Sequence, residues 1–156
     1  FRSRRPLMET ARARTVLQPW ATMIVSGWKP LETRNWATAH RGRLLIHASA
    51  RKSRIAWARQ VTPLLAFLNS KGVDLTTLPT GCLVGEVSLD STTPLRAEQT
   101  RDLAPFGWLL DARLVWQLSS PNAYALPIPA RGQVGLWTLH TSELALVFGK
   151  ISTVLK

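Results

Sequence analysis

The chain has 156 residues and is strongly basic, with 20 lysines and arginines against 9 aspartates and glutamates and a formal net charge of +11 at pH 7. This length suits a single domain with a core of its own, and the one cysteine, Cys82, excludes an intramolecular disulfide and a four-cysteine metal site. The charge excludes few classes of protein, but it favours a polyanionic partner, above all nucleic acid.

The first part of the chain predicts a short helix followed by a strand. Hydrophobic residues recur at helical spacing over 18–26, where Pro19 suits the first turn and Gly27 suits the end of the helix. The stretch 31–36 then alternates as a strand does, with its charged residues on one face.

An Arg-Gly turn follows and leads into an apolar strand over 44–47. The longest predicted helix covers 53–70, with Ser53 in the N-cap position and apolar residues mostly at core spacing. Pro63 lies inside this pattern, and we expect it to kink or divide the helix.

Apolar runs separated by proline and glycine dominate the second half of the chain. A strand is predicted over 82–90, where Gly85 indicates a bulge or the close approach of another backbone. The polar connection over 92–107 has room for one helical turn. Further strands are predicted over 108–118, 124–129 and 133–139.

No repeat, low-complexity tract or linker divides the sequence, so we expect one domain over 11–140, of α+β class, with five or six short strands and helices packed outside. Residues 1–10 are expected to be a basic arm or a non-native remnant, and residues 141–156 a tail compatible with a helix. No apolar run reaches the roughly 20 residues of a membrane helix, and no secretory leader is recognisable. We therefore expect a soluble, cytoplasmic protein with no membrane partner.

Five motifs occur together in this domain: QPWA, GWKPLETRNW, HRGRLLIHAS, GCLVGEV and PARGQVGLWTL. Together they resemble the ASCH domain, the activating signal cointegrator 1 homology domain, which belongs to the PUA-like superfamily. The pairing of Gln-Pro-Trp with Gly-x-Lys-x-x-Glu-x-Arg is the specific part, and the resemblance spans about residues 14–140. It implies a PUA-like pseudobarrel of five to six mostly antiparallel strands, with a cleft beside the first helix and the strand after it.

The resemblance implies either nucleic-acid binding or, as in some small members, hydrolysis of acetylcytidine or cleavage of RNA. The amidohydrolase pattern places its lysine at Lys29 and its arginine at Arg34, but its nucleophilic threonine falls on Glu32. Thr33 lies one position away, on the opposite face of a strand. A lysine activates a hydroxyl when it is neutral, whereas an adjacent glutamate favours its charged form. Catalysis by Lys29 with a carboxylate, Glu32 or Glu98, is therefore the weaker hypothesis.

The binding interpretation uses the same charges. Lys29 and Arg34 can neutralise phosphates, and Glu32 can orient the guanidinium or accept a hydrogen bond from a base. Trp28 and Trp36 flank these charges and offer flat faces for an unstacked base. We expect two basic clusters to form a phosphate track beside these charges: Arg41, Arg43, Arg51 and Lys52. The resemblance also implies that Trp137 lies in the cleft wall.

Each feature also has a purely structural interpretation. Glu32 and Arg34 can form an ordinary ion pair, and basic clusters can be a solvated face. The histidines and the cysteine lack the spacing of a metal site, so we expect His47 to be hydrogen-bonded in the core and Cys82 to be buried. Four tryptophans are predicted to pack in the core: Trp20, Trp57, Trp108 and Trp116.

The sequence thus predicts a nucleic-acid-binding ASCH protein that needs no cofactor or metal. It favours single-stranded RNA, or an exposed base, over a duplex, and RNA over DNA. Two alternatives stay open: a nucleic-acid-processing enzyme, and a cleft that docks a protein partner. The oligomeric state is left undetermined.

Overall fold

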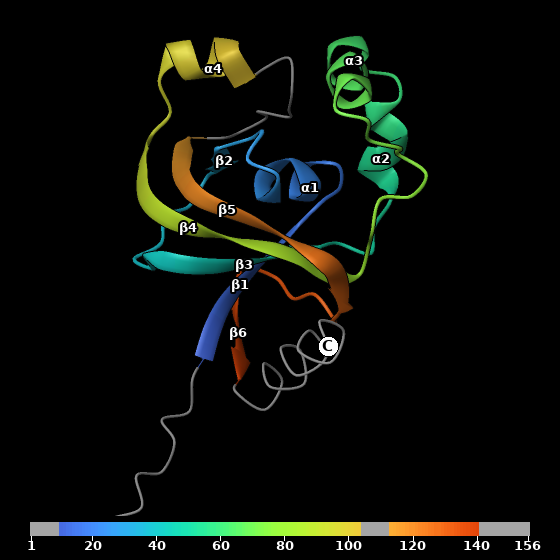
Figure 1. Cartoon of the computed structure of the whole chain (residues 1–156). Helices are drawn as coiled ribbons and strands as arrows, with labels where there is room; N and C mark the ends of the chain where they lie inside the picture. Colours follow the sequence, from blue (N-terminus) through green and yellow to red (C-terminus); the bar gives the residue numbers. More distant parts are fainter. Residues whose placement is uncertain (1–9, 104–112, 141–156) are drawn as a thin grey trace, which may run out of the picture.

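The computed structural model describes residues 10–103 and 113–140, which form one curved sheet with helices against it (Figure 1). The strands are β1 (Thr10–Val16), β2 (Leu31–Arg34), β3 (Gly42–Ala48), β4 (Cys82–Pro94), β5 (Leu114–Pro129) and β6 (Leu136–His140). The helices are α1 (Trp20–Val25), α2 (Ser53–Ala58), α3 (Thr62–Ser70) and α4 (Ala97–Leu103).

The sheet has the order β2-β5-β4-β3-β1-β6. Its pairs are antiparallel in the described part of the chain, except that β1 runs parallel to β3. The two long strands, β4 and β5, bend strongly and carry much of the curvature visible in Figure 1. The predicted α+β class and its mostly antiparallel sheet are confirmed.

Several predicted elements change their bounds. From Leu114 on, the strands expected over 108–118 and 124–129 are one continuous strand, β5, which pairs with β4 along most of its length. The helix expected over 53–70 is divided into α2 and α3, and Pro63 lies in the first turn of α3. Ser53 was predicted as the N-cap, but it is the first residue of α2, and Lys52 is the N-cap. The connection over 92–107 contains α4, which is longer than one turn.

One strand, β1, escaped prediction because its hydrophobic signal is weak. Its sequence, TARARTV, alternates arginine with small residues, and the structure buries the two alanines, Ala11 and Ala13. Three predicted features lie outside the described residues: the arm expected over 1–10, except Thr10, which begins β1, the tail expected over 141–156, and Trp108.

Two apolar clusters, one on each face of the sheet, hold the fold together. The larger cluster joins α1, α2 and α3 to β3, β4 and β5, and all but one of the α1 side chains are buried in it. The smaller cluster lies under β1, β3 and β6 and includes Ala13, Leu45 and Trp137. Since strand side chains alternate between faces, Arg14 faces the α1 side, whereas Thr15 faces the smaller cluster.

Gln18, which is fully buried, ties α1 to the loop that precedes β4. Its amide nitrogen donates to the Thr22 hydroxyl and to the Pro79 carbonyl, both at 2.9 Å, and its amide oxygen accepts from the Thr22 backbone N–H at 3.0 Å. Helix α1 ends at Val25, just before Gly27, the residue predicted to end it. Gly27 has a φ of +80°, a backbone conformation that residues with a side chain rarely adopt. No helix among the residues described here is long and apolar enough to cross a membrane.

Gly85 lies where β4, β5 and α1 meet, and both predictions made for it are confirmed. The register of β4 against β5 shifts beside it, and a Cβ at this position would overlap the Asn122 carbonyl oxygen and approach the Val25 side chain to 2.8 Å. Only a residue without a side chain allows α1 to pack this closely on the sheet.

We predict that Gly85→Ala lowers the free energy of unfolding by about 1–3 kcal/mol, because the added methyl group must push the α1 helix or β5 away. Urea denaturation of both proteins measures this difference. Asp90→Ala, at an exposed position of the same strand, is the matched control and should change stability by less than about 0.5 kcal/mol. Equal stability of the Gly85→Ala protein would contradict the close packing of α1.

Candidate functional site

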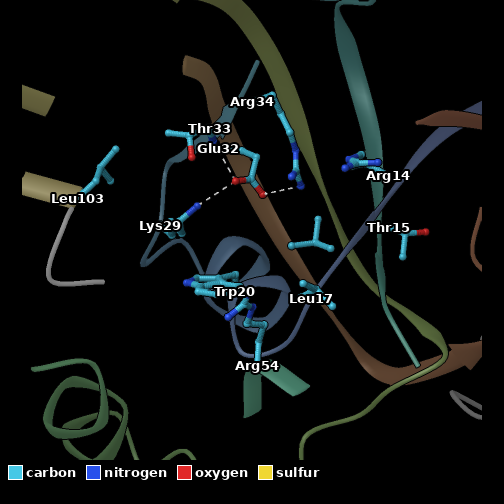
Figure 2. A pocket seen from close by; sticks show the side chains of 11 residues that line it. Arg14, Thr15, Leu17, Trp20, Lys29, Glu32, Thr33, Arg34, Arg54 and Leu103 are labelled. Carbon is cyan, nitrogen blue, oxygen red and sulfur yellow. Dashed lines mark hydrogen bonds and ion pairs between the residues drawn. The ribbon is translucent and has the colours of Figure 1, made fainter. Parts of the chain in front are cut away.

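The carboxylate of Glu32 lies at the centre of a group of charges on β2 (Figure 2). Its Oε1 is 3.2 Å from Lys29 Nζ and accepts from the Thr33 backbone N–H at 2.9 Å, and its Oε2 is 3.4 Å from Arg34 Nη2. Lys29 Nζ also donates to the Leu31 carbonyl at 3.0 Å. The predicted ammonium, carboxylate and guanidinium are therefore held together by direct contacts.

Glu32 and Lys29 are both buried, with 8% of each residue exposed. Burial by itself raises the pKa of Glu32, but the charges of Lys29 and Arg34 and the Thr33 hydrogen bond outweigh it, so the pKa lies below its ordinary value. Glu32 is thus an anion that fixes two cations, and both of its oxygens already have partners.

Arg14 brings a further positive charge to this site from β1. Its guanidinium lies over the Trp36 ring, with Cζ 5.6 Å from the centroid, and its Nη1 donates to the Gly135 carbonyl at 3.1 Å. Burial, and then the charge of Arg34, lower the pKa of Arg14 to about 10, although Glu32 opposes the shift. The folded protein therefore holds this charge against an electrostatic penalty.

Two buried donors at the site have no hydrogen-bond partner among the described residues: Nε of Arg14 and Nε of Arg34. Buried guanidinium N–H groups are normally paired, because an unpaired donor loses its hydration without compensation. Within the described part of the chain, the site therefore has more guanidinium donors than acceptors.

These residues line a pocket of about 230 Å³ between β1, β2, α1 and α2 (Figure 2). Among the described residues, its lining holds four cationic side chains and one carboxylate. The lining residues are Arg14, Thr15, Val16, Leu17, Trp20, Lys29, Glu32, Thr33, Arg34, Arg54 and Leu103.

The tryptophan of the pocket is Trp20, for which the sequence favoured a core role. It has both roles, because it is 9% exposed, packs in the larger cluster and still lines the cavity. Its ring lies 5.8 Å from that of Trp57, over which the Arg54 guanidinium lies at 5.8 Å. An indole and a guanidinium thus form the wall opposite Glu32 in Figure 2.

The three tryptophans that were predicted to line the site, Trp28, Trp36 and Trp137, lie outside the lining of this pocket. Trp28 packs edge-on against Phe67 at 6.1 Å, with Lys71 Nζ 5.8 Å from its ring centroid. Trp36 packs edge-on against Trp116 at 4.8 Å and supports Arg14 from behind.

Trp137 is buried on the other face of the sheet, in the smaller cluster. Its Nε1 donates to the Thr15 hydroxyl at 3.1 Å. Trp137 therefore supports β1 from beneath and does not contribute to the wall of this pocket.

The four predicted phosphate-track residues lie in different places. Arg43 pairs with Glu86 at 2.9 Å on the sheet face away from α1. Arg41 donates to carbonyls of its own loop and to the Thr92 hydroxyl. Lys52 is exposed at the start of α2, and Arg51 lines a neighbouring pocket.

Sequence reasoning missed Arg14, Arg54 and the pocket-lining role of Trp20. The signal for Arg14 was present, because an arginine between two small residues of a strand faces away from the side that buries them. Arg54 ends the basic stretch 50–54 that was expected beside the cleft, but which of its cations lines the pocket depends on how α2 packs against α1. Glu98, the alternative catalytic carboxylate, is exposed on α4 and lies outside the pocket lining.

Within residues 10–103 and 113–140, no group of three or more His, Cys, Asp or Glu side chains is placed to hold a metal ion. His47 is buried and hydrogen-bonded to the Ala130 carbonyl at 2.6 Å, as predicted. Cys82 is buried, and burial raises the pKa of its thiol, so it is a packing residue rather than a nucleophile.

A comparison with known families matches residues 15–116 to the model of the ASCH domain. This chain belongs to the ASCH domain family. The match covers the Gln-Pro-Trp helix, the charged strand β2 and most of the sheet.

Two related proteins are the activating signal cointegrator 1 of Homo sapiens, 32% identical over 130 residues, and that of Mus musculus, 30% identical over 127 residues. The matches cover 81% and 80% of this chain but 22% and 21% of those proteins. This ASCH chain therefore spans about a fifth of the length of the curated relatives it matches.

Among solved structures, that of ASCH from Zymomonas mobilis superimposes with a TM-score of 0.53 at 15% identity, covering 89% of this chain and 94% of that one. A mutant form of the same protein gives a TM-score of 0.54 at 15% identity, covering 89% and 96%. At this identity the likeness establishes the fold alone, and the predicted PUA-like class is confirmed.

We predict that Glu32→Gln lowers the free energy of unfolding by roughly 3 kcal/mol or more, because it leaves Lys29, Arg34 and Arg14 without a counter-charge. Glu98→Gln, the same change at an exposed site, is the control and should be nearly neutral. Chemical denaturation of the wild type and the two variants measures this difference. Equal stability of the two variants would contradict the conclusion that Glu32 stabilises the site.

The loss caused by Glu32→Gln should depend on pH. The pKa of Glu32 in the folded protein lies below its ordinary value of 4.5, so its charge stabilises the fold fully above about pH 4.5. That contribution disappears as the pH falls through the folded pKa. Denaturation at a series of acid pH values should therefore show the stabilities of the wild type and the variant converging, and a constant difference would be inconsistent with this linkage.

Arg14→Met should leave the free energy of unfolding within about 1 kcal/mol of the wild-type value, or raise it. The folded-state pKa of Arg14 is lowered, so its charge destabilises the folded state at neutral pH, and methionine keeps the apolar contact with Trp36. Arg12→Met, two residues earlier on the same strand, serves as the control in the same urea titration because Arg12 makes an ordinary hydrogen bond to Thr138. A loss above about 3 kcal/mol for Arg14→Met would show that Arg14 is structural.

Proposed function

We propose that this ASCH domain binds nucleic acid, single-stranded RNA or an exposed base in preference to a plain duplex, in the pocket beside β2. The observation that carries the proposal is an excess of positive charge: among the described residues, Arg14, Lys29 and Arg34 share the single carboxylate of Glu32. A phosphate would supply the missing negative charge.

The shape and lining of the pocket favour a single strand. A cavity of about 230 Å³ admits one phosphate or one unstacked base, whereas the bases of a duplex stay inside its stack. Trp20 and Arg54 line the wall and are the residue types on which single-strand-binding proteins stack bases. Arg34, whose side chain is 26% exposed, is the cation that an entering phosphate would meet.

Pure binding is supported over hydrolysis by the contacts of Lys29. Its ammonium donates to both the Glu32 carboxylate and the Leu31 carbonyl, so it is held as a cation and not as a base that could activate a hydroxyl. Glu32, with both oxygens engaged, is likewise unsuited to attack a substrate.

The central prediction is that a fluorescein-labelled single-stranded RNA binds with a salt dependence set by its phosphates. Contacts with about four to six phosphates give a slope of about −3 to −4 in a plot of log affinity against log salt concentration. Fluorescence anisotropy at a series of salt concentrations measures it, with a matched DNA strand and a duplex for comparison. A flat plot would rule out electrostatic recognition.

Arg34→Ala should weaken this binding by about tenfold, the size expected for a charge-assisted hydrogen bond. Lys71→Ala, which removes one positive charge from the exposed end of α3, is the matched control and should have little effect. Equal effects of the two substitutions would indicate that nucleic acid binds no better than to any basic protein. A protein partner would then become the better assignment for the pocket.

The enzymatic alternative has its own test. Incubation with acetylated cytidine and with labelled RNA, analysed by chromatography and gel electrophoresis, should leave both substrates unchanged. Turnover that disappears in Lys29→Ala would replace the binding proposal with a catalytic one.

A further inference from the structure

A second, larger pocket of about 530 Å³ borders the first. The two share Arg14, Thr15 and Leu17, so β1 and the residue after it form the boundary between them. The second pocket adds Arg51 and Arg131 to the positive lining, and none of the described residues that line it is acidic. Its charge therefore has the same sign as that of the first pocket, with no carboxylate to offset it.

Arg131 is held over this pocket by its neighbours in the chain. The Ala130 carbonyl accepts from Nε2 of His47 at 2.6 Å, so the proton of the neutral ring is on Nε2. Gly132 packs against the same ring, since a Cβ there would lie 2.8 Å from His47 Cε1 and 2.9 Å from the Thr15 hydroxyl oxygen. The residues on both sides of Arg131 are thus fixed to β1 and β3.

His47 keeps this support neutral. The ring is 1% exposed, and burial lowers its pKa even though the bond to Ala130 opposes the shift. The same ring lines the pocket, and its buried Nδ1 has no hydrogen-bond partner among the described residues. At the rim, Val134 is 96% exposed, an apolar side chain that the fold itself does not bury.

The arrangement suits a ligand with negative charges at regular intervals. Arg14 lines both pockets, so its guanidinium is placed to contact a phosphate that joins an occupant of one pocket to an occupant of the other. Arg51 and Arg131 then face the next phosphate, and Val134 offers an apolar contact to its sugar or base. A single small anion would need only one of the two pockets.

We propose that the two pockets bind consecutive nucleotides of one strand, with Arg14 contacting the phosphate between them. This proposal rests on the binding function proposed above for the first pocket. It adds a second nucleotide subsite, formed by Arg51 and the segment around Arg131, and it makes the dinucleotide the smallest ligand that engages the whole surface.

The test compares two probes, uridine monophosphate and the dinucleotide pUpU, by isothermal titration calorimetry at low salt. The wild-type protein should bind pUpU about tenfold more tightly or better, because the second nucleotide gains charge-assisted contacts. Arg131→Ala and Arg51→Ala should each weaken pUpU binding by about threefold to tenfold and leave uridine monophosphate binding unchanged. With a longer RNA, each should make the salt slope shallower by about 0.7, the loss of one phosphate contact.

Two further variants separate the possible outcomes. Gly132→Ala keeps every charge but displaces the segment around Arg131, so it should weaken binding of pUpU and not of uridine monophosphate, while thermal unfolding reports whether it remains folded. Arg34→Ala should weaken both ligands.

If pUpU binds no more tightly than uridine monophosphate, or if Arg131→Ala weakens both equally, the second subsite is refuted while the proposed function stands. If neither ligand nor RNA binds to the wild type, the proposed function fails and the second subsite with it.

Discussion

The buried carboxylate of Glu32 is the interaction on which the site depends. A carboxylate that has lost most of its hydration must be compensated, and here Lys29 and Arg34 supply the charge and the Thr33 backbone N–H supplies a hydrogen bond. The compensation is mutual, because the ammonium of Lys29 is equally buried. The contacts leave each cation in one position before any ligand arrives.

The site holds more positive charge than this carboxylate can neutralise. Arg14 remains close enough to Arg34 for the two charges to oppose each other, and burial adds to the cost of ionising it. Proteins tolerate such local instability at functional sites when the rest of the fold supports it. Here the support is visible: Trp36 lies behind the Arg14 guanidinium, Trp116 lies behind Trp36, and the Gly135 carbonyl accepts from Arg14 Nη1.

The curved sheet turns one short strand into the boundary between two cavities. Because β1 alternates its side chains, Arg14 faces the α1 side while Thr15 faces the smaller cluster, where Trp137 holds its hydroxyl. The close packing of α1 at Gly85 brings Trp20 to the wall of the first pocket. A change in the position of α1 would therefore alter the pocket without touching its charges.

The sequence by itself determined what is local. Lys29, Glu32 and Arg34 lie within six consecutive residues, Glu32 and Arg34 on one strand face, so their contact followed from spacing alone, and the motifs around them were enough to indicate the family and its fold. Short elements bounded by glycine or proline were also predictable, such as helix α1, which ends just before Gly27. Whether Lys29, Glu32 and Arg34 bind a ligand remains a prediction.

Only the tertiary structure decided which distant residues join these charges. An indole is large and apolar enough to pack in any of several places, so sequence could not tell that Trp20 lines the pocket while Trp28 packs on α3. An arginine likewise takes its role from partners far along the chain: Arg43 meets Glu86 on the neighbouring strand, whereas Arg14 meets Arg34 and Trp36. Charge and ring content are properties of the sequence, but the sharing of one cavity depends on long-range packing, which has no local signal.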